Sequence, residues 1–165
     1  MTSRKGNAEP WRRTRHAELL RRTMHGPMWH GPAVLEATER LTATQAASHP
    51  IAAAHSAWEL VLHIAAWAEI ATARLNGTPW RTPTKAEDFP PALVRGGTRA
   101  WTAAKARAAA AYETLAVAVE TSADPSLDTL VIGQRYSRTE MLHGVVEHGV
   151  YHAGQIVLLR KIING

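Results

Sequence analysis

Apolar residues recur at three- and four-residue intervals in a segment that begins near residue 57, and this spacing predicts a long helix. One side of that helix would carry Trp58, Leu62, Ala66 and Ile70. Ser56 and Glu59 have the spacing of a capping box, in which the serine hydroxyl and the glutamate carboxylate each accept a free backbone N–H. Gly77 should end the helix near Asn76, because glycine readily adopts the left-handed backbone that follows many helices.

A second long helix is predicted near the end of the sequence. Ser137 and Glu140 form another capping-box pattern, and the segment MLHGVVEHGVYHAGQIVLLRKII follows them. Arg160 and Lys161 lie in its last turns, where positive charge complements the helix dipole. We therefore expect this helix to continue almost to the last residue.

Two further helices are predicted over residues 11–25 and over the alanine-rich segment 97–121. Their candidate core residues are Trp11, Leu19, Leu20 and Met24 in the first, and Trp101, Tyr112, Leu115 and Val119 in the second. Pro32 is suited to be the first residue of another helix, which would carry Val34, Leu35, Thr38 and Leu41. Residues 42–54 should form a turn and a loop, and 77–91 a proline-rich connection.

The alternation typical of strands occurs only in the short, isolated segment 128–133. Four main helices without strands predict an all-α fold, specifically a four-helix bundle. The connection before the third long helix is long enough to cross that bundle. Residues 1–10 are predicted to be a disordered tail and residues 11–165 a single domain, since 165 residues suit one hydrophobic core.

The composition of the chain excludes several kinds of chemistry and of protein. The chain has no cysteine, so it has neither disulfides nor thiolate ligands nor a thiol nucleophile of its own. The sequence lacks an apolar run long enough for a membrane span, and its first residues lack the apolar stretch of a signal peptide, so we expect a cytoplasmic protein. The formal net charge of +5 is concentrated in residues 1–25. A solvated basic helix face explains this best, and docking on nucleic acid or another anionic surface is the alternative that we do not favour.

Histidines supply the candidate chemistry. His148 and His152 are four residues apart on a predicted helix, so both rings project from one face and can share an ion. Gln155 lies one turn further along the same face. His63 lies two turns inside an otherwise apolar helix, where a neutral ring needs partners for both nitrogens. Spacing alone leaves open whether these three histidines bind a metal or are hydrogen-bonded structural residues.

The segments HSAWELVLHIAAWAEIATARLNG (55–77) and LHGVVEHGVYHAGQIVLLRK (142–161) resemble the two signature helices of the DinB/YfiT-like superfamily. The likeness extends over about residues 16–163 and is loose in 78–135. It implies a four-helix bundle of unusual connectivity with a long crossover, a homodimer, and one divalent metal ion on His63, His148 and His152. Some relatives transfer low-molecular-weight thiols and some isomerise maleylpyruvate, while many have no assigned activity.

Three imidazoles leave a tetrahedral ion one position short, which is typical of a catalytic site. We expect Zn or Ni, which imidazole ligands suit well. Fe or Mn stays an alternative, because such ligands discriminate poorly among these metals. The leading hypothesis is a metal-dependent transferase of small thiols or a hydrolase of small molecules. The alternative is a metal- or ligand-binding module without turnover.

Several nearby residues are weaker candidates for the substrate side of the site. Gln155 would touch the substrate, Glu59 would be a base or a partner of His63 if it were not a helix cap, and His55 would face the same cavity. His30 would line its mouth. The remaining expectations are that Tyr151 is packed, that His143 points elsewhere, and that His16, His25 and His49 are exposed.

Overall fold

The computed structural model describes residues 11–165, and all regular secondary structure within that range is helical. Between Leu130 and Ser137 there is a single isolated bridge and no strand in the described part. The α-helices are α1 (Trp11–His25), α2 (Val34–Ala37), α3 (Ala43–Ala46), α4 (Ala57–Leu75), α5 (Lys85–Asp88), α6 (Gly97–Thr121) and α7 (Arg138–Asn164), with 3-10 helices η1 (Val94–Gly96) and η2 (Asp124–Asp128). The predicted all-α class is confirmed.

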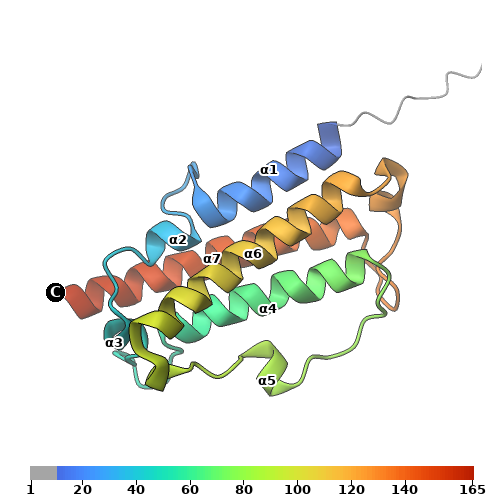
Figure 1. Ribbon diagram of the computed structural model, residues 1–165. Coiled ribbons are helices and arrows are strands. Elements are labelled where there is room, and N and C mark those ends of the chain that lie inside the picture. Colours follow the sequence, from blue (N-terminus) through green and yellow to red (C-terminus); the bar gives the residue numbers. More distant parts are fainter. Residues whose placement is uncertain (1–10) are drawn as a thin grey trace, which may run out of the picture.

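The four long helices, α1, α4, α6 and α7, pack side by side (Figure 1). The most extensive contacts between the long helices follow the order α1, α6, α4, α7 and back to α1. Helices α4 and α6 run in the same direction, so the connection over residues 76–96 returns along the length of the molecule and carries α5 on the way. Helix α7 runs antiparallel to α4 beside it, and this pair builds the site described below.

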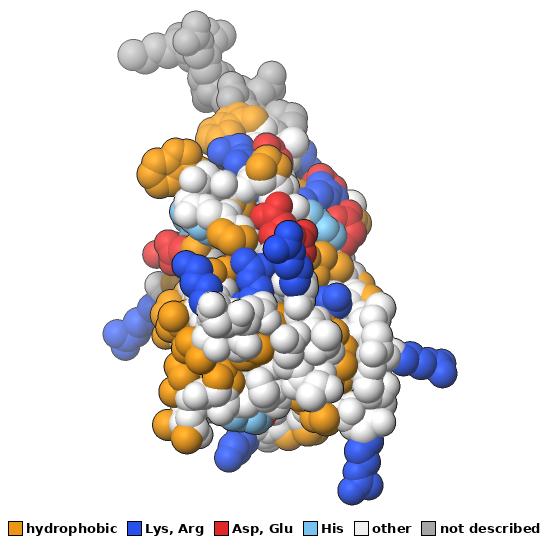
Figure 2. Space-filling model, turned by 90° about the vertical axis from the view of Figure 1, so that its left-hand side faces the viewer, with side chains coloured by type: hydrophobic (Ala, Val, Ile, Leu, Met, Phe, Trp, Pro, Cys, Tyr) orange, Lys and Arg blue, Asp and Glu red, His pale blue; other side chains and the backbone are white. Residues whose placement is uncertain are grey.

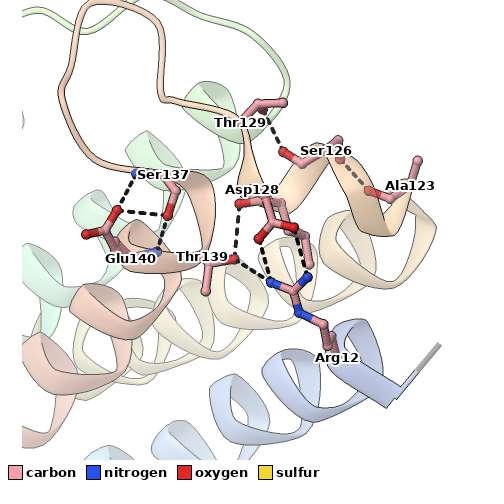
Figure 3. Close-up of polar contacts among 9 residues, drawn as sticks. Arg12, Ala123, Ser126, Asp128, Thr129, Ser137, Thr139 and Glu140 are labelled. Carbon is pink, nitrogen blue, oxygen red and sulfur yellow. Dashed lines mark hydrogen bonds and ion pairs between the residues drawn. The ribbon is translucent and has the colours of Figure 1, made fainter. Parts of the chain in front are cut away.

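Both predicted capping boxes begin the helices as expected. The Ser56 backbone N–H donates to the Glu59 carboxylate at 2.8 Å, and the Glu59 N–H donates to the Ser56 hydroxyl at 3.2 Å. Figure 3 shows the equivalent arrangement of Ser137 and Glu140 at the start of α7, with distances of 2.6 and 3.2 Å. These pairs satisfy backbone donors that would otherwise have no partner in the first turn, and so fix where both helices of the site begin.

Short helices replace two of the predicted elements. The predicted helix after Pro32 is only four residues long, because the Thr38 hydroxyl donates to the Leu35 carbonyl at 2.7 Å and Arg40 adopts a φ of 64°. Residues 42–54 are not only turn and loop: Thr42 and Gln45 form a third capping box that begins α3.

The core lies where the four long helices meet, and every predicted core residue of α6 is buried in it. The largest fully buried side chains include Trp58 and Tyr112. Each such side chain contributes roughly 1.5–3 kcal/mol by burial. Trp11, by contrast, is 59 % exposed, so its predicted place in the core was wrong; it is the first residue of α1.

The basic side chains of α1 are paired with acidic residues from the rest of the chain. Arg12 forms an ion pair with Asp128 at 2.7 Å (Figure 3), and Arg13 one with the buried Asp124 at 2.6 Å. Arg21 bridges Glu113 and Glu120 of α6. The local excess of charge therefore attaches α1 to α6 and η2 rather than forming a purely solvated face.

At the end of the molecule where α7 finishes, basic side chains stand at separate positions, some of them beside acidic ones (Figure 2). Within residues 11–165, no helix is long and apolar enough to cross a membrane. The predicted disordered tail, residues 1–10, lies outside the described residues.

Candidate metal centre

Three histidines from the two antiparallel helices converge on one point. His63 comes from α4, and His148 and His152 come from α7. The Nε2 atom of His148 lies 2.9 Å from Nε2 of His63 and 3.0 Å from Nε2 of His152. His63 and His152 are buried and His148 is half-buried. Three nitrogens this close together are the geometry expected of ligands that share an ion.

The fold explains this convergence. The four-residue spacing of His148 and His152 places both rings on one face of α7, and α4 packs against α7. Ser56 begins α4 so that His63 falls two turns inside the helix, level with that face. Gly149, next to His148, allows close approach of α7 to its neighbours, because a Cβ atom there would lie 2.6 Å from both the Tyr112 hydroxyl and a Thr23 methyl group.

Hydrogen bonds to the opposite ring nitrogens fix two of the tautomers. Nδ1 of His63 lies 2.6 Å from the carbonyl oxygen of Asp88, and Nδ1 of His152 lies 2.6 Å from Oε1 of Gln155. A carbonyl oxygen can only accept, so each Nδ1 carries the proton and each neutral ring has an unprotonated Nε2. Both lone pairs therefore point toward Nε2 of His148.

His148 cannot satisfy both neighbours as a hydrogen-bond donor. Its Nε2 carries at most one proton, whereas unprotonated nitrogens face it from two sides. Its Nδ1 is buried and has no hydrogen-bond partner. A cation between the three Nε2 atoms would resolve this conflict, since each nitrogen would then direct its lone pair at positive charge. Tetrahedral zinc with bonds of about 2.0–2.1 Å would separate the nitrogens by roughly 3.3 Å, close to the two distances measured around His148.

The surroundings keep these rings neutral. Burial, together with the neighbouring His152 and His63, lowers the pKa of His148 to about 3. Burial also lowers the pKa of His63 and of His152, although the Asp88 carbonyl and the Gln155 side chain oppose the effect at each ring. Neutral imidazole is the form that binds metal, so the site is prepared for a cation at neutral pH.

Aromatic rings and α5 hold His63 in place. Phe89 stacks on His63 with ring centroids 4.0 Å apart and on His55 at 3.7 Å, so it lies between the two imidazoles. The Trp67 indole N–H donates to the Asp88 carboxylate at 2.8 Å. Asp88 thus uses its backbone for His63 and its side chain for Trp67, and this fixes the end of α5 against α4.

Two cavities flank the histidines. The larger, of about 670 Å³, opens on His63 and His148 and extends along α4 past Trp67 to Arg74. The smaller, of about 350 Å³, is lined by His152, His55 and Gln155. Small-molecule sites commonly have volumes of about 300–1,000 Å³, so the larger cavity can admit a substrate beside the histidines.

The weaker candidates for the substrate side of the site lie in different parts of the structure. Glu59 serves as the helix cap, and its carboxylate lies 3.0 Å from Nε2 of His49. Gln155 lines the smaller cavity but also accepts a hydrogen bond from Nδ1 of His152, a structural role that the sequence did not suggest. His55 lines the same smaller cavity and is not part of the cluster.

Three predicted positions need correction. His30 lies in a separate surface pocket with Trp29 and Arg160, because the glycine- and proline-rich turn directs it away from the cluster. Tyr151 is 63 % exposed and not packed, although its ring edge lies against His152. His16 is buried, with its ring 5.0 Å from that of His143; the predicted exposure was wrong because α7 covers this side of α1.

Sequence reasoning missed several residues around the site, namely Trp67, Arg74, Asp88, Phe89 and Tyr136. The tryptophan and the arginine follow His63 at four and eleven residues on α4, close to whole helical turns, and this spacing was a usable signal. The others come from the connection after α4 and from the turn before α7. Their position depends on the tertiary structure.

Comparison with known proteins places the chain in a family. A family model described as the DinB superfamily matches residues 29–156. The match includes α4 with His63 and the part of α7 that carries His148 and His152. Comparisons with curated proteins and with solved structures gave no match. The chain therefore belongs to the DinB superfamily.

Proposed function

We propose that this protein is a metal-dependent enzyme that uses a divalent cation on His63, His148 and His152. The observation that carries the proposal is the convergence of three Nε2 atoms, two of them with tautomers set by Asp88 and Gln155. A divalent cation held there would lower the pKa of a coordinated thiol or water and so supply a nucleophile at neutral pH. Zinc or nickel suits three imidazoles best.

The reaction we favour is transfer of a low-molecular-weight thiol to a small electrophile, with hydrolysis of a small molecule as the second possibility at the same site. Three neutral ligands leave the cation its full charge, which favours ionisation of an incoming thiol. The chain has no cysteine, so the sulfur must arrive on a cosubstrate. The larger cavity beside His63 and His148 would receive the electrophile.

The four long helices and the crossover over residues 76–96 would then be the DinB-type bundle that carries this centre. The crossover contributes Asp88 and Phe89, which anchor and stack on His63. This arrangement explains why a long connection is useful: it covers one side of the site with residues that an ordinary short turn could not supply. A cysteine-free chain fits the reducing cytoplasm, where we expect the enzyme to act.

Turnover assays test the proposal. The metal-loaded protein would be incubated with bacillithiol, mycothiol or glutathione and with an electrophile such as a chloro-aromatic compound or an epoxide. We expect metal-dependent conjugation that is lost in His148→Ala. Turnover that ignores every thiol but consumes the electrophile with water would identify a hydrolase. Full metal occupancy without turnover on a broad panel would favour the alternative, a metal- or ligand-binding module.

A further inference from the structure

Arg74 is a buried cation that lacks an acidic partner. It lies near the end of α4 and is 6 % exposed. The other buried or bridging arginines described above pair with carboxylates, but within residues 11–165 no carboxylate lies within 4 Å of the Arg74 guanidinium. A buried charge is costly unless an opposite charge or strong hydrogen bonds compensate it. The buried charge of Arg74 therefore suggests a role other than stabilising the fold.

The neighbours of Arg74 hold it without neutralising it. The Trp67 and Trp80 rings lie 5.6 and 5.9 Å from its guanidinium carbon, within the range of cation–π contacts. Tyr136 is its polar neighbour and lines the same cavity. Aromatic rings fix the guanidinium in place but cannot use its set of N–H donors, which suit a carboxylate.

Arg74 lines the larger cavity, the same one that opens on His63 and His148. Trp67 contacts both the histidines and Arg74. Its ring lies 6.3 Å from that of His63 and 5.9 Å from that of His148, and it also contacts the Arg74 guanidinium. The two carboxylates of the cavity are already engaged, since Asp88 accepts from Trp67 and Glu140 from Ser137. The guanidinium is thus the uncompensated charge at the far end of the cavity.

We infer that Arg74 is a specificity-determining residue that binds a carboxylate of the ligand in this cavity. His63 and Arg74 are eleven residues apart on α4, a rise of about 16 Å along the helix. The ligand is therefore an extended small molecule, with its carboxylate at Arg74 and its reacting end toward the histidines. Tyr136 lines the same cavity and can donate its hydroxyl hydrogen to the same anion. The assignment of a reacting end rests on the proposed function; the carboxylate site does not.

Binding measurements on the full chain test this inference. Calorimetry would compare straight-chain and phenyl-substituted carboxylates of increasing length with their primary amides, and with phenyl phosphate, on metal-loaded and on EDTA-treated protein. We expect the wild type to prefer carboxylates over amides in both forms. Arg74→Gln should weaken carboxylate binding by about ten- to a hundredfold while leaving amide binding unchanged. Arg74→Lys should retain part of the preference.

A matched control is Arg107→Gln, because Arg107 lies nearby on α6 but is paired with Glu69 at 2.7 Å. This control should bind carboxylates as the wild type does. Arg74→Met should fold with an unchanged or raised unfolding midpoint, because it replaces an unpaired buried charge with an apolar side chain of similar length. Its loss of carboxylate preference would then not be a folding defect.

Several results would overturn the inference. They are equal binding of carboxylates and amides by the wild type at every chain length, a preference that survives Arg74→Gln, and stronger binding of phenyl phosphate than of any carboxylate. A preference seen only in metal-loaded protein would also overturn it, since the anion would then be binding the metal. A metal-free wild type would contradict the proposed function alone, because the EDTA-treated comparison would still report on Arg74.

Discussion

At the scale of single residues, the geometry of the site depends on the hydrogen-bond partners of the histidines as well as on the histidines themselves. Hydrogen bonds at Nδ1 orient His63 and His152 so that both Nε2 atoms face His148. Outer partners of this kind commonly affect metal affinity by about ten- to a hundredfold. The His63 partner is a backbone carbonyl, which side-chain substitution cannot remove, so Gln155 is the informative position.

Gln155→Leu should weaken metal binding by roughly tenfold or more while the three ligands remain in place, because His152 loses the acceptor that fixes its tautomer. Competition with a chromogenic chelator measures the effect. Gln134→Leu is the control, since Gln134 lines neither cavity beside the histidines. Equal affinity of Gln155→Leu and the wild type would show that this hydrogen bond does not tune the site.

Acid should destabilise the metal-free protein through the same histidines. Their pKa values in the folded protein lie below the ordinary value near 6.5, and that of His148 is about 3. Between these limits the unfolded chain binds more protons than the folded chain, so stability falls as the pH decreases from about 6.5 toward 3. Urea unfolding of EDTA-treated protein at pH 7.5, 6 and 5 measures this. His148→Ala should show a shallower loss, and an identical slope in the two proteins would contradict the assignment.

At the scale of elements, α7 carries two histidines of the site and also packs closely against neighbouring helices. Gly149 lies against α1 and α6, whereas nothing approaches within 4 Å of the Cβ position of Gly154, five residues further on. The same substitution should therefore have opposite effects at these two positions of one helix.

Gly149→Ala should destabilise the fold by about 1–3 kcal/mol, because its new methyl group would overlap Tyr112 and Thr23. Gly154→Ala should stabilise it by up to about 1 kcal/mol, since alanine has the higher helix propensity and meets no neighbour. Urea unfolding gives both values. A stabilised Gly149→Ala would mean that α7 does not approach α1 and α6 this closely.

Much of this element structure could be predicted from the sequence, because local signals decide it. The capping boxes at Ser56 and Ser137 fix where the two helices that carry the histidines begin. Helix geometry then places His148 and His152, which are four residues apart, on one face. The short helices α3 and α5 were not predicted, and α2 is shorter than the helix predicted after Pro32, since single turns leave little periodic pattern. Likewise, Asp88 reaches His63 only because the crossover folds back along α4.

At the scale of the whole molecule, the pairing of α1 with α6 explains the charge distribution. Arginines that look like a basic patch in the sequence meet carboxylates that lie about a hundred residues later. Ion pairs between residues so far apart cannot be predicted from the distribution of charge along the sequence. The family match spans residues 29–156 and includes α4 and the part of α7 that carries the histidines, the two helices on which the sequence resemblance was based.

We also propose that the protein is a homodimer of two-fold symmetry. Tyr151, Leu158 and Ile162 form an exposed apolar stripe on α7, between 47 and 63 % accessible, which a second copy would cover. Light scattering at micromolar concentration should give twice the chain mass of 18.0 kDa. Leu158→Glu should shift the protein to monomer, and Val117→Glu on α6 should not. A monomeric wild type would reject the proposal.

Metal analysis of the purified protein tests the central claim most directly. Mass spectrometry of the elements should find close to one divalent ion per chain in the wild type and a small fraction of that in His63→Ala, His148→Ala and His152→Ala. His55→Ala and His143→Ala should retain the ion, because neither ring belongs to the cluster. Retention of metal by the His152→Ala protein, or equal loss from the two controls, would contradict the three-histidine centre.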